Sequence, residues 1–279
     1  MTTYTTAIAV GVADVRRDPD PASELVTQAL MHTPAKEENI RDGWTHVTLP
    51  DYTGWVQSNQ LAEPALKGFT KIGANCATPL DLVAVITTTH APLFADAVGD
   101  ETLDTVYLST ALPLLDTTQA RLQVALPGGA SGWLARGTVS IRRSSEAYPR
   151  SPVSVITTYA RAFIGVPYLW GGTSYQGIDC SGFVQLCYRM GGYIIPRDAD
   201  QQYEALPHSI EQHTMQEGDL LFFGHPSITH VAMALNQKEF IHAEGHEFNR
   251  VVINSLDPAD EHYNKRLHEL IYGLKRVIL

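Results

Sequence analysis

Two stretches in the second half of the chain carry apolar residues at spacings of three and four. The first covers residues 155–164 and ends at Gly165, and the second covers residues 183–190. This period places the apolar side chains on one face, so both stretches are predicted to be helices. Asp179 stands shortly before the second stretch and is its predicted N-cap.

The segments that follow read as strands. Gly218 begins a turn that leads into the apolar run 220–223, and two further strand candidates cover 228–235 and 239–243. The segment 273–279 is a fourth candidate that closes the chain. Helices ahead of an antiparallel set of strands are the order of an α+β domain.

The first half of the chain contains short strand candidates separated by turns. Residues 6–12, 80–86 and 105–110 are candidates, whereas 24–31 fits a strand or a short helix equally well. The stretch 47–56 reads Val-Thr-Leu-Pro-Asp-Tyr-Thr-Gly-Trp-Val, and 124–134 repeats this order of strand, Pro-containing turn and Gly-Trp-hydrophobic. Two copies predict two similar small β-barrels, in which each Gly permits a close turn and each Trp caps an apolar core.

These patterns divide the chain into three predicted domains. The barrels are expected at 1–66 and 67–143, and a third domain at 150–279. The polar segment 142–152, which Pro interrupts twice, is interpreted as the linker. A length of 279 residues with 44% hydrophobic and 18% charged residues agrees with two or three globular domains.

Composition narrows the class of function. A net charge of −10 argues against a binder of nucleic acid or of an anionic membrane. We find no run of roughly 18 apolar residues and no secretory leader pattern, so the expected location is cytoplasmic. Three cysteines do not make a disulfide framework, and Cys76 and Cys187 are expected to pack in cores. Since paired Cys/His ligand spacings are absent from the sequence, no zinc site is expected. Hydrolysis by a thiol and a histidine base would require neither a metal nor an organic cofactor.

The remaining cysteine is the candidate nucleophile. Cys180 would lie on the first turn of the predicted helix, where the positive end of the helix dipole lowers a thiol pKa. His230 begins a predicted strand and His242 lies on the next one, so the two side chains are expected to face each other. Cys180 would then attack, His230 would act as the base, and His242 would orient its imidazole.

Four linked motifs identify a family at this point. Gly-Gly-Thr-Ser with Asp-Cys-Ser-Gly-Phe within 171–183, Gly-Asp-Leu-Leu-Phe-Phe at 218–223, Thr-His-Val-Ala at 229–232 and Phe-Ile-His-Ala at 240–243 resemble the NlpC/P60 cysteine peptidases of bacterial cell-wall metabolism. The resemblance covers the predicted third domain and implies a papain-like α+β core. The repeated Gly-Trp pattern resembles bacterial SH3 domains, which often precede such a domain.

The family resemblance implies a substrate class. NlpC/P60 enzymes cleave γ-D-glutamyl bonds in peptidoglycan peptides, and the branch with two SH3-like domains resembles γ-D-glutamyl-L-diamino acid endopeptidases. Those enzymes act on freed murein peptides with an N-terminal L-Ala, which implies a role in wall recycling. Whether the diamino acid is L-Lys or meso-diaminopimelate stays open. A secreted hydrolase of intact peptidoglycan and a wall-binding SH3 protein with weak activity are the alternatives.

Residues beside the nucleophile are candidates for substrate binding. Tyr168 is expected to help stabilise the oxyanion together with the Cys180 backbone N–H. Trp170 either packs the glycine-rich turn or contacts the substrate. Asp179 and Ser181 flank the nucleophile, and helix capping is the alternative role of both.

Three further residues are expected to recognise the free amine of the substrate. Asp198 follows the predicted catalytic helix, where a buried carboxylate would pair with an ammonium, although it could instead pair with Arg197. Ala199 stands where the resembling branch often has Ser, so one supporting hydrogen bond is missing. On the first SH3-like domain, Tyr52 and Glu24 are candidates to reach the same amine.

Overall fold

The computed structural model describes residues 4–65 and 81–278. It divides into two compact units, Met1–Ala147 and Tyr148–Leu279, and each is described by itself. Cys76, which was expected to pack in a core, lies outside the described residues.

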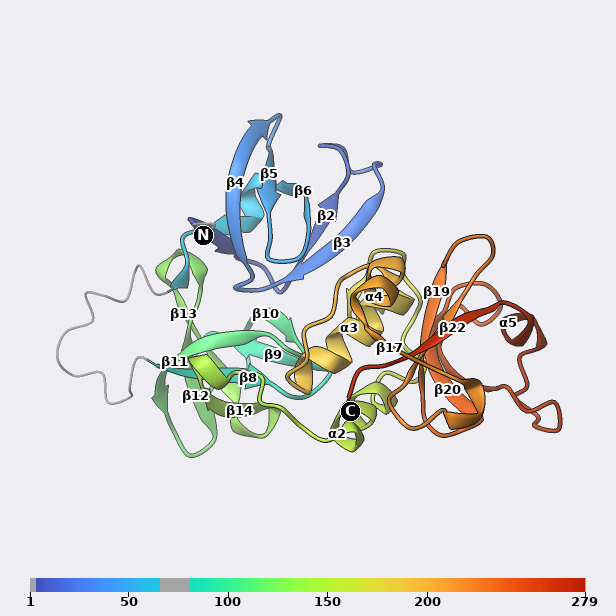
Figure 1. The fold of residues 1–279 in the computed structure, drawn as a ribbon. Coiled ribbons are helices and arrows are strands. Elements are labelled where there is room, and N and C mark those ends of the chain that lie inside the picture. Colours follow the sequence, from blue (N-terminus) through green and yellow to red (C-terminus); the bar gives the residue numbers. More distant parts are fainter. Residues whose placement is uncertain (1–3, 66–80, 279) are drawn as a thin grey trace. The chain divides into compact units, whose positions relative to one another are not determined.

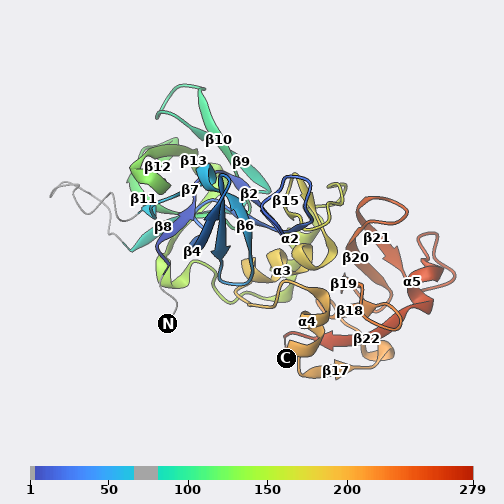
Figure 2. The same ribbon diagram turned by 90° about the horizontal axis from the view of Figure 1, so that it is seen from above.

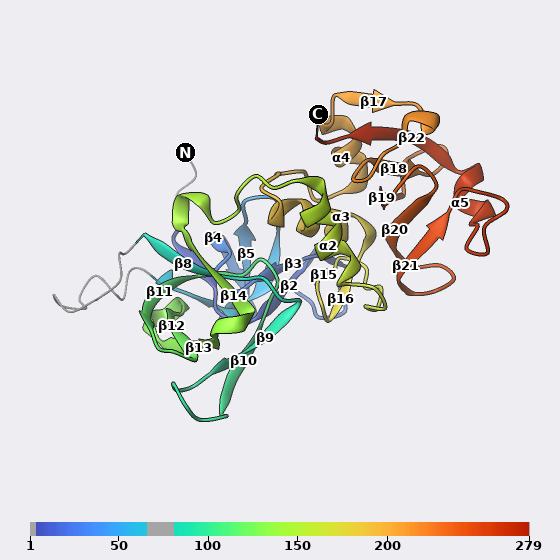
Figure 3. The ribbon, with the colours of Figure 1, turned by 90° about the horizontal axis from the view of Figure 1, so that it is seen from below.

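The first unit contains two seven-stranded antiparallel sheets (Figures 1 and 3). The first sheet has the order β3-β2-β6-β5-β4-β1-β7. Its strands are β1 Thr6–Ile8, β2 Val12–Arg16, β3 Leu25–Leu30, β4 Pro34–Arg41, β5 Trp44–Thr48, β6 Thr53–Gln57 and β7 Leu61–Ala62. The ambiguous stretch 24–31 is therefore a strand, as its pairing with β2 explains.

The second sheet repeats the first one strand for strand. Its order is β10-β9-β13-β12-β11-β8-β14, which is the order of the first sheet with seven added to every number. Its strands are β8 Leu82–Ile86, β9 His90–Phe94, β10 Thr102–Tyr107, β11 Ala111–Thr117, β12 Arg121–Ala125, β13 Ser131–Ala135 and β14 Val139–Arg143. The duplication inferred from the Gly-Trp pattern is confirmed by this topology.

The Gly-Trp motif occupies the same hairpin in both sheets. Gly54 of β6 pairs with Val47, and Gly132 of β13 pairs with Val124. A Cβ on either glycine would lie 2.7 Å from a core side chain, so close packing excludes any larger residue. The expectation that the tryptophans cap the cores is wrong. They are half-buried, because side chains alternate along a strand and the neighbouring Val56 and Leu134 take the core face.

The second unit combines helices with a six-stranded antiparallel sheet (Figure 2). The sheet order is β17-β22-β18-β19-β20-β21, and a separate ribbon pairs β15 with β16. The strands are β15 Thr173–Ser174, β16 Gly177–Ile178, β17 His208–Ile210, β18 Leu220–Phe223, β19 His230–Ala234, β20 Glu239–Glu244, β21 Arg250–Ser255 and β22 Ile271–Arg276. The helices are α2 Val153–Arg161, α3 Cys180–Met190, α4 Ala199–Ala205 and α5 Lys265–Glu269.

Helix α3 is the central element of this unit. Its apolar residues are buried almost without exception, as the spacing of residues 183–190 predicts. The buried hydroxyl of Tyr188 donates to the Gly218 carbonyl, which ties the helix to the turn before β18. The same turn is also held by β22. The guanidinium of Arg276 on that strand donates to both oxygens of the buried Asp219 carboxylate at 2.8 Å. Helix α3 also packs against β19 and β20.

Across residues 4–65 and 81–278, no helix is long and apolar enough to cross a membrane. In the same ranges, no group of three or more His, Cys, Asp or Glu side chains is arranged to hold a metal ion.

Candidate active site

Cys180 is the first residue of α3, and Asp179 is the N-cap as predicted. The Asp179 Oδ1 accepts the Gly182 N–H at 2.7 Å and the Ser181 hydroxyl at 3.3 Å. Its Oδ2 accepts the Gly171 N–H at 3.0 Å, so the same carboxylate fixes the glycine-rich turn to the helix start. The capping role is therefore present for Asp179, and Ser181 supports it.

A buried arginine completes this network. Arg197 is 2% exposed and donates to both Asp179 oxygens, at 3.0 Å and 2.6 Å. It also donates to the Ser181 hydroxyl at 3.0 Å. Two fork-like hydrogen bonds to one carboxylate are the arrangement for which the planar guanidinium is suited. These hydrogen bonds go to Asp179, and the charge of Asp198, the partner that the sequence offered, adds to that of Asp179 in raising the pKa of Arg197.

The environment of Cys180 corrects the expectation of a lowered thiol pKa. Burial, and then the negative charge of Asp179, raise the pKa of the Cys180 thiol to about 12. The backbone N–H groups of Val231 and Ser181 and the charge of Arg197 act in the opposite direction, but they do not outweigh desolvation. The Val231 contact places the sulfur beside the residue that follows His230. The free Cys187 is fully buried, in agreement with a packing role.

The two predicted histidines meet on one face of the sheet. Met233 of β19 pairs with Ile241 of β20, and continuing this register puts Ala232 opposite His242. His230 lies two residues before Ala232 and therefore on the same face. Its Nε2 is 2.8 Å from the His242 Nδ1, with the ring planes at 76° to each other. The expectation that these side chains face each other from neighbouring strands is confirmed.

Beyond His242 the hydrogen bonds continue to two asparagines. The His242 Nε2 is 3.0 Å from the Oδ1 of Asn254 on β21. That Oδ1 also accepts from the Nδ2 of Asn264, the N-cap of α5, at 3.0 Å. The side chain of His242 is completely buried, and both asparagines are at least nine-tenths buried. The two asparagines therefore extend the pair of histidines into a buried polar chain.

Both histidines are held in their neutral forms. Burial, followed by the proximity of His242 and Arg266, keeps the pKa of His230 well below its usual value. Burial lowers the pKa of His242 to about 4, although its hydrogen bond to Asn254 and the charge of Glu244 act in the opposite direction. At neutral pH the site thus contains a neutral thiol and two neutral imidazoles.

Tyr168 lies close to the nucleophile. Burial, and then the proximity of Cys180 and Asp179, raise the pKa of its phenol far above the usual value, so the hydroxyl remains a donor. The ring packs against Gly245, where an added Cβ would lie 2.7 Å from a ring carbon. Trp170 is 61% exposed, so it does not pack into the turn.

Asp198 differs from its expected setting. It is half-buried rather than buried, and it precedes helix α4, which the sequence analysis did not predict. Its Oδ2 accepts a hydrogen bond from the Gln201 amide at 3.2 Å. The carboxylate remains partly exposed to solvent at the start of α4.

The two candidates from the first barrel belong to the other unit. Glu24 is exposed and forms an ion pair with Arg17 at 2.6 Å. Tyr52 is half-buried in the turn between β5 and β6. Their contact with a substrate stays a prediction.

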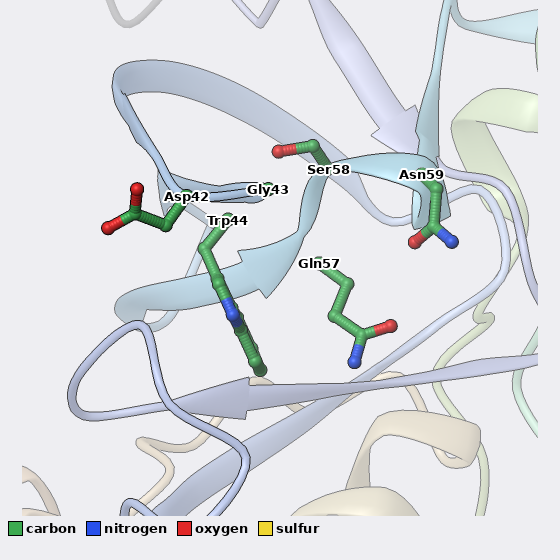
Figure 4. Close-up of a pocket in the computed structure, with 6 residues that line it drawn as sticks. All are labelled: Asp42, Gly43, Trp44, Gln57, Ser58 and Asn59. Carbon is green, nitrogen blue, oxygen red and sulfur yellow. The ribbon is translucent and has the colours of Figure 1, made fainter.

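The first barrel also carries an open hollow of about 440 Å³. Figure 4 shows Trp44 and Gln57 side by side in it, on directly paired positions of β5 and β6. The other lining residues are Asp42, Gly43, Ser58 and Asn59. None of the predicted site residues lines this hollow, and its neutral amides and single carboxylate do not make a nucleophilic centre.

Two residues of the buried hydrogen-bonded chain, Asn254 and Asn264, were missed from the sequence. The signal for Asn264 was present, because Asn directly before a helical segment is a common N-cap. The signal for Asn254 was weaker. Asn is uncommon in strands, and a buried Asn side chain normally has a hydrogen-bond partner. The partner of Arg197 could not be identified from spacing alone.

Three segments of the chain match known domain families. Residues 165–270 match the NlpC/P60 family, 15–61 match the bacterial dipeptidyl-peptidase Sh3 domain, and 86–141 match the YKFC SH3b2 domain. A dipeptidyl-peptidase 6 from Lysinibacillus sphaericus is 31% identical over 280 residues, which cover 94% of this chain and 96% of that protein.

Two further matches come from Bacillus cereus. A gamma-D-glutamyl-L-lysine dipeptidyl-peptidase is 29% identical over 235 residues, covering 80% of this chain and 68% of that protein. The crystal structure of an NlpC/P60 family protein superimposes with a TM-score of 0.84 at 25% identity, covering 98% of this chain and 99% of the other. The similarity thus includes both N-terminal sheets as well as the unit that contains Cys180.

Proposed function

Since the chain belongs to the NlpC/P60 family and is a cysteine peptidase, we propose that Cys180, His230 and His242 are its nucleophile, base and orienting group. The observation that carries this assignment is the hydrogen bond of 2.8 Å between the two imidazoles, next to a sulfur that contacts the Val231 N–H. The reaction is hydrolysis of the bond between a γ-D-glutamyl residue and a diamino acid, as the names of the similar dipeptidyl-peptidases support.

The steps follow from the neutral resting pair. His230 takes the Cys180 proton as the sulfur attacks the γ-carbonyl carbon of D-Glu, and a carbon–sulfur bond forms. The imidazolium then gives its proton to the amine of the diamino acid while the carbon–nitrogen bond breaks, leaving a thioester. Water attacks the thioester with His230 again as base, and the thiolate leaves and recovers the proton. His242 holds the base in place and accepts its Nε2–H throughout.

The oxyanion is assigned to two donors. The Cys180 backbone N–H belongs to the first turn of α3, where N–H groups lack partners within the helix. The Tyr168 phenol is the second donor, because its raised pKa keeps the proton on the oxygen. Donors already in place when the negative charge develops contribute most to catalysis of acyl transfer.

The finer specificity is also part of the proposal. The substrate is a freed murein peptide with an N-terminal L-Ala, whose ammonium is held by Asp198, Tyr52 and Glu24. Trp170, exposed beside the glycine-rich turn, contacts the peptide. The catalytic core is papain-like and spans 150–279 after SH3-like domains at 1–66 and 67–143, and the enzyme recycles wall peptides in the cytoplasm.

The direct test supplies L-Ala-γ-D-Glu-L-Lys, its meso-diaminopimelate counterpart and intact peptidoglycan to the full-length protein. Release of L-Ala-D-Glu from at least one tripeptide is expected, and Cys180→Ala should abolish it while Cys187→Ser keeps most of it. Acetylating the L-Ala amine should lower kcat/KM by roughly 10²-fold or more, since a site that pairs a charge rejects an analogue lacking it. Intact wall cleaved as fast as the tripeptides would contradict the recycling role.

A further inference from the structure

Asn254 and Asn264 form the end of the buried chain that begins at His230. Asn254 lies on β21 and is 5% exposed, and Asn264 caps α5 and is 8% exposed. Neither side chain contacts the nucleophile, so any effect on the reaction must pass through the histidines.

Two backbone groups determine which way the asparagine amides are oriented. The Leu267 N–H can only donate, and it donates to the Asn264 Oδ1 at 3.0 Å. The Asn264 Nδ2 therefore faces Asn254 and donates to its Oδ1 at 3.0 Å. The Asn254 Nδ2 in turn donates to the backbone carbonyl of His262 at 3.3 Å, and a carbonyl can only accept. Turning either amide over would place donor against donor or acceptor against acceptor.

The orientation of the two amides determines the tautomers of both imidazoles. The His242 Nε2 faces an oxygen, the Asn254 Oδ1, at 3.0 Å and so must carry the hydrogen. A neutral imidazole has one N–H, which leaves the His242 Nδ1 as an acceptor. The His230 Nε2, 2.8 Å away, then carries the hydrogen of that contact. The lone pair of His230 is left on Nδ1, the ring nitrogen that His242 does not engage.

We propose that Asn254 and Asn264 are positioning residues that set the tautomers of His242 and His230 and thereby keep the His230 Nδ1 lone pair ready for the Cys180 proton. The inference rests on the proposed roles of Cys180 and His230. It also explains how a neutral His242 supports catalysis: when His230 becomes an imidazolium, its Nε2–H still meets a lone pair rather than a second N–H. The lowered pKa of His242 keeps that lone pair available.

The tautomers are read directly by NMR of the protein labelled with 15N in histidine, because protonated and unprotonated ring nitrogens have well-separated shifts. In the wild-type protein at neutral pH, His230 and His242 are both expected to carry their hydrogen on Nε2. A hydrogen on the Nδ1 of His242 in the wild-type protein would overturn the proposal without any variant. Assignment uses His230→Gln and His242→Gln, each of which removes one set of signals.

Two matched substitutions separate an effect on tautomers from an effect on folding. Asn254→Asp keeps an acceptor facing the His242 Nε2, so both tautomers should be unchanged. Its kcat should therefore fall far less than that of Asn264→Asp. Asn264→Asp still accepts the Leu267 N–H and still caps α5, but it presents an oxygen to Asn254. The Asn254 amide should turn and donate to His242, which moves the hydrogen of both imidazoles to Nδ1.

The expected loss in Asn264→Asp is roughly 10²-fold or more in kcat, the range for a positioned base, with little change in KM. Asn236→Asp is the control, because it adds the same charge in an exposed turn where its Oδ1 already accepts two backbone N–H groups. Unchanged kcat and unchanged tautomers in Asn264→Asp would refute the proposal. If the His230→Gln variant kept full activity, the proposed catalytic roles would fail instead, whatever the tautomers are.

Discussion

Removal of the Arg197 guanidinium tests how the nucleophile is held. In Arg197→Met the side chain keeps its length and loses its charge, so the Asp179 carboxylate remains buried without its partner. Breaking a buried ion pair from one side costs about 3–5 kcal/mol, much of it the penalty for the uncompensated charge. The remaining donors to Asp179, which are the Gly171 and Gly182 N–H groups and the Ser181 hydroxyl, offset part of this cost. We expect the second unit to lose about 3 kcal/mol of unfolding free energy.

A matched control is available in the same unit. Lys238 and Asp257 form an ion pair of 2.6 Å, the same distance as Arg197 and Asp179, but the Lys238 side chain is 64% exposed and that of Arg197 is 2% exposed. Solvent screens an exposed pair, so Lys238→Met should leave stability unchanged within error. The two pairs share the same shortest distance but differ in burial and in the second hydrogen bond that the Arg197 guanidinium makes to Asp179, so the comparison shows that distance alone does not determine the contribution to stability.

The assay is urea-dependent labelling of Cys187, read by mass spectrometry of its peptide. Cys187 is completely buried in the second unit, so its labelling reports the opening of that unit in the full-length protein. The double variant Asp179→Asn with Arg197→Met should recover part of the loss, since it removes the unpaired charge. A loss below about 1 kcal/mol in Arg197→Met, or no recovery in the double variant, would refute the reasoning about the buried pair.

Other consequences can be measured separately. His242→Ala should lower kcat by roughly 10²–10⁴-fold and His242→Gln by less, because the amide can still accept the His230 Nε2–H. Tyr168→Phe should lower kcat by about 10²-fold as an oxyanion donor is lost, and Gly245→Ala should do the same by displacing the Tyr168 ring. The folded protein binds fewer protons than the unfolded chain between pH 6.5 and 4, because the pKa of His242 is lowered to about 4. The free energy of unfolding, measured by urea titration, should therefore fall as the pH drops, and His242 should account for about 2 kcal/mol of the loss between pH 7.5 and 5. His242→Asn should make this pH dependence weaker.

Two helices and four of the six strands of the large sheet in the second unit could be predicted, because local pattern and tertiary role agree for them. The apolar spacing in residues 183–190 is that of a helix, and Asp179 carries the N-cap signal, so both were correct. After His230, β19 is continuously apolar, and β20 places Phe240, Ile241 and Ala243 around His242, which fits the burial of both strands. The family and the peptidase class, inferred from the linked motifs, are confirmed by the comparisons.

Other features depended on partners that lie far away in the sequence. Helix α4 is short and has one buried residue, Gln202, so its periodicity carried little signal. The tryptophans of the Gly-Trp repeat were expected to cap the cores, but alternation along β6 gives the core face to Val56. The role of Asn254 exists only through the register between β20 and β21, which composition does not encode.

The wrong expectation about Cys180 shows how two general effects compete in one place. A helix N-terminus favours a thiolate, but the same position is buried and lies beside the Asp179 carboxylate, and desolvation outweighs the favourable terms. A nucleophile that rests as a thiol requires a base whose lone pair is free and correctly directed when substrate binds. A lowered His230 pKa meets the first requirement, since the ring is not already protonated at neutral pH. The direction of the lone pair requires the fixed tautomer, so the asparagines that set it matter more here than they would beside a preformed thiolate.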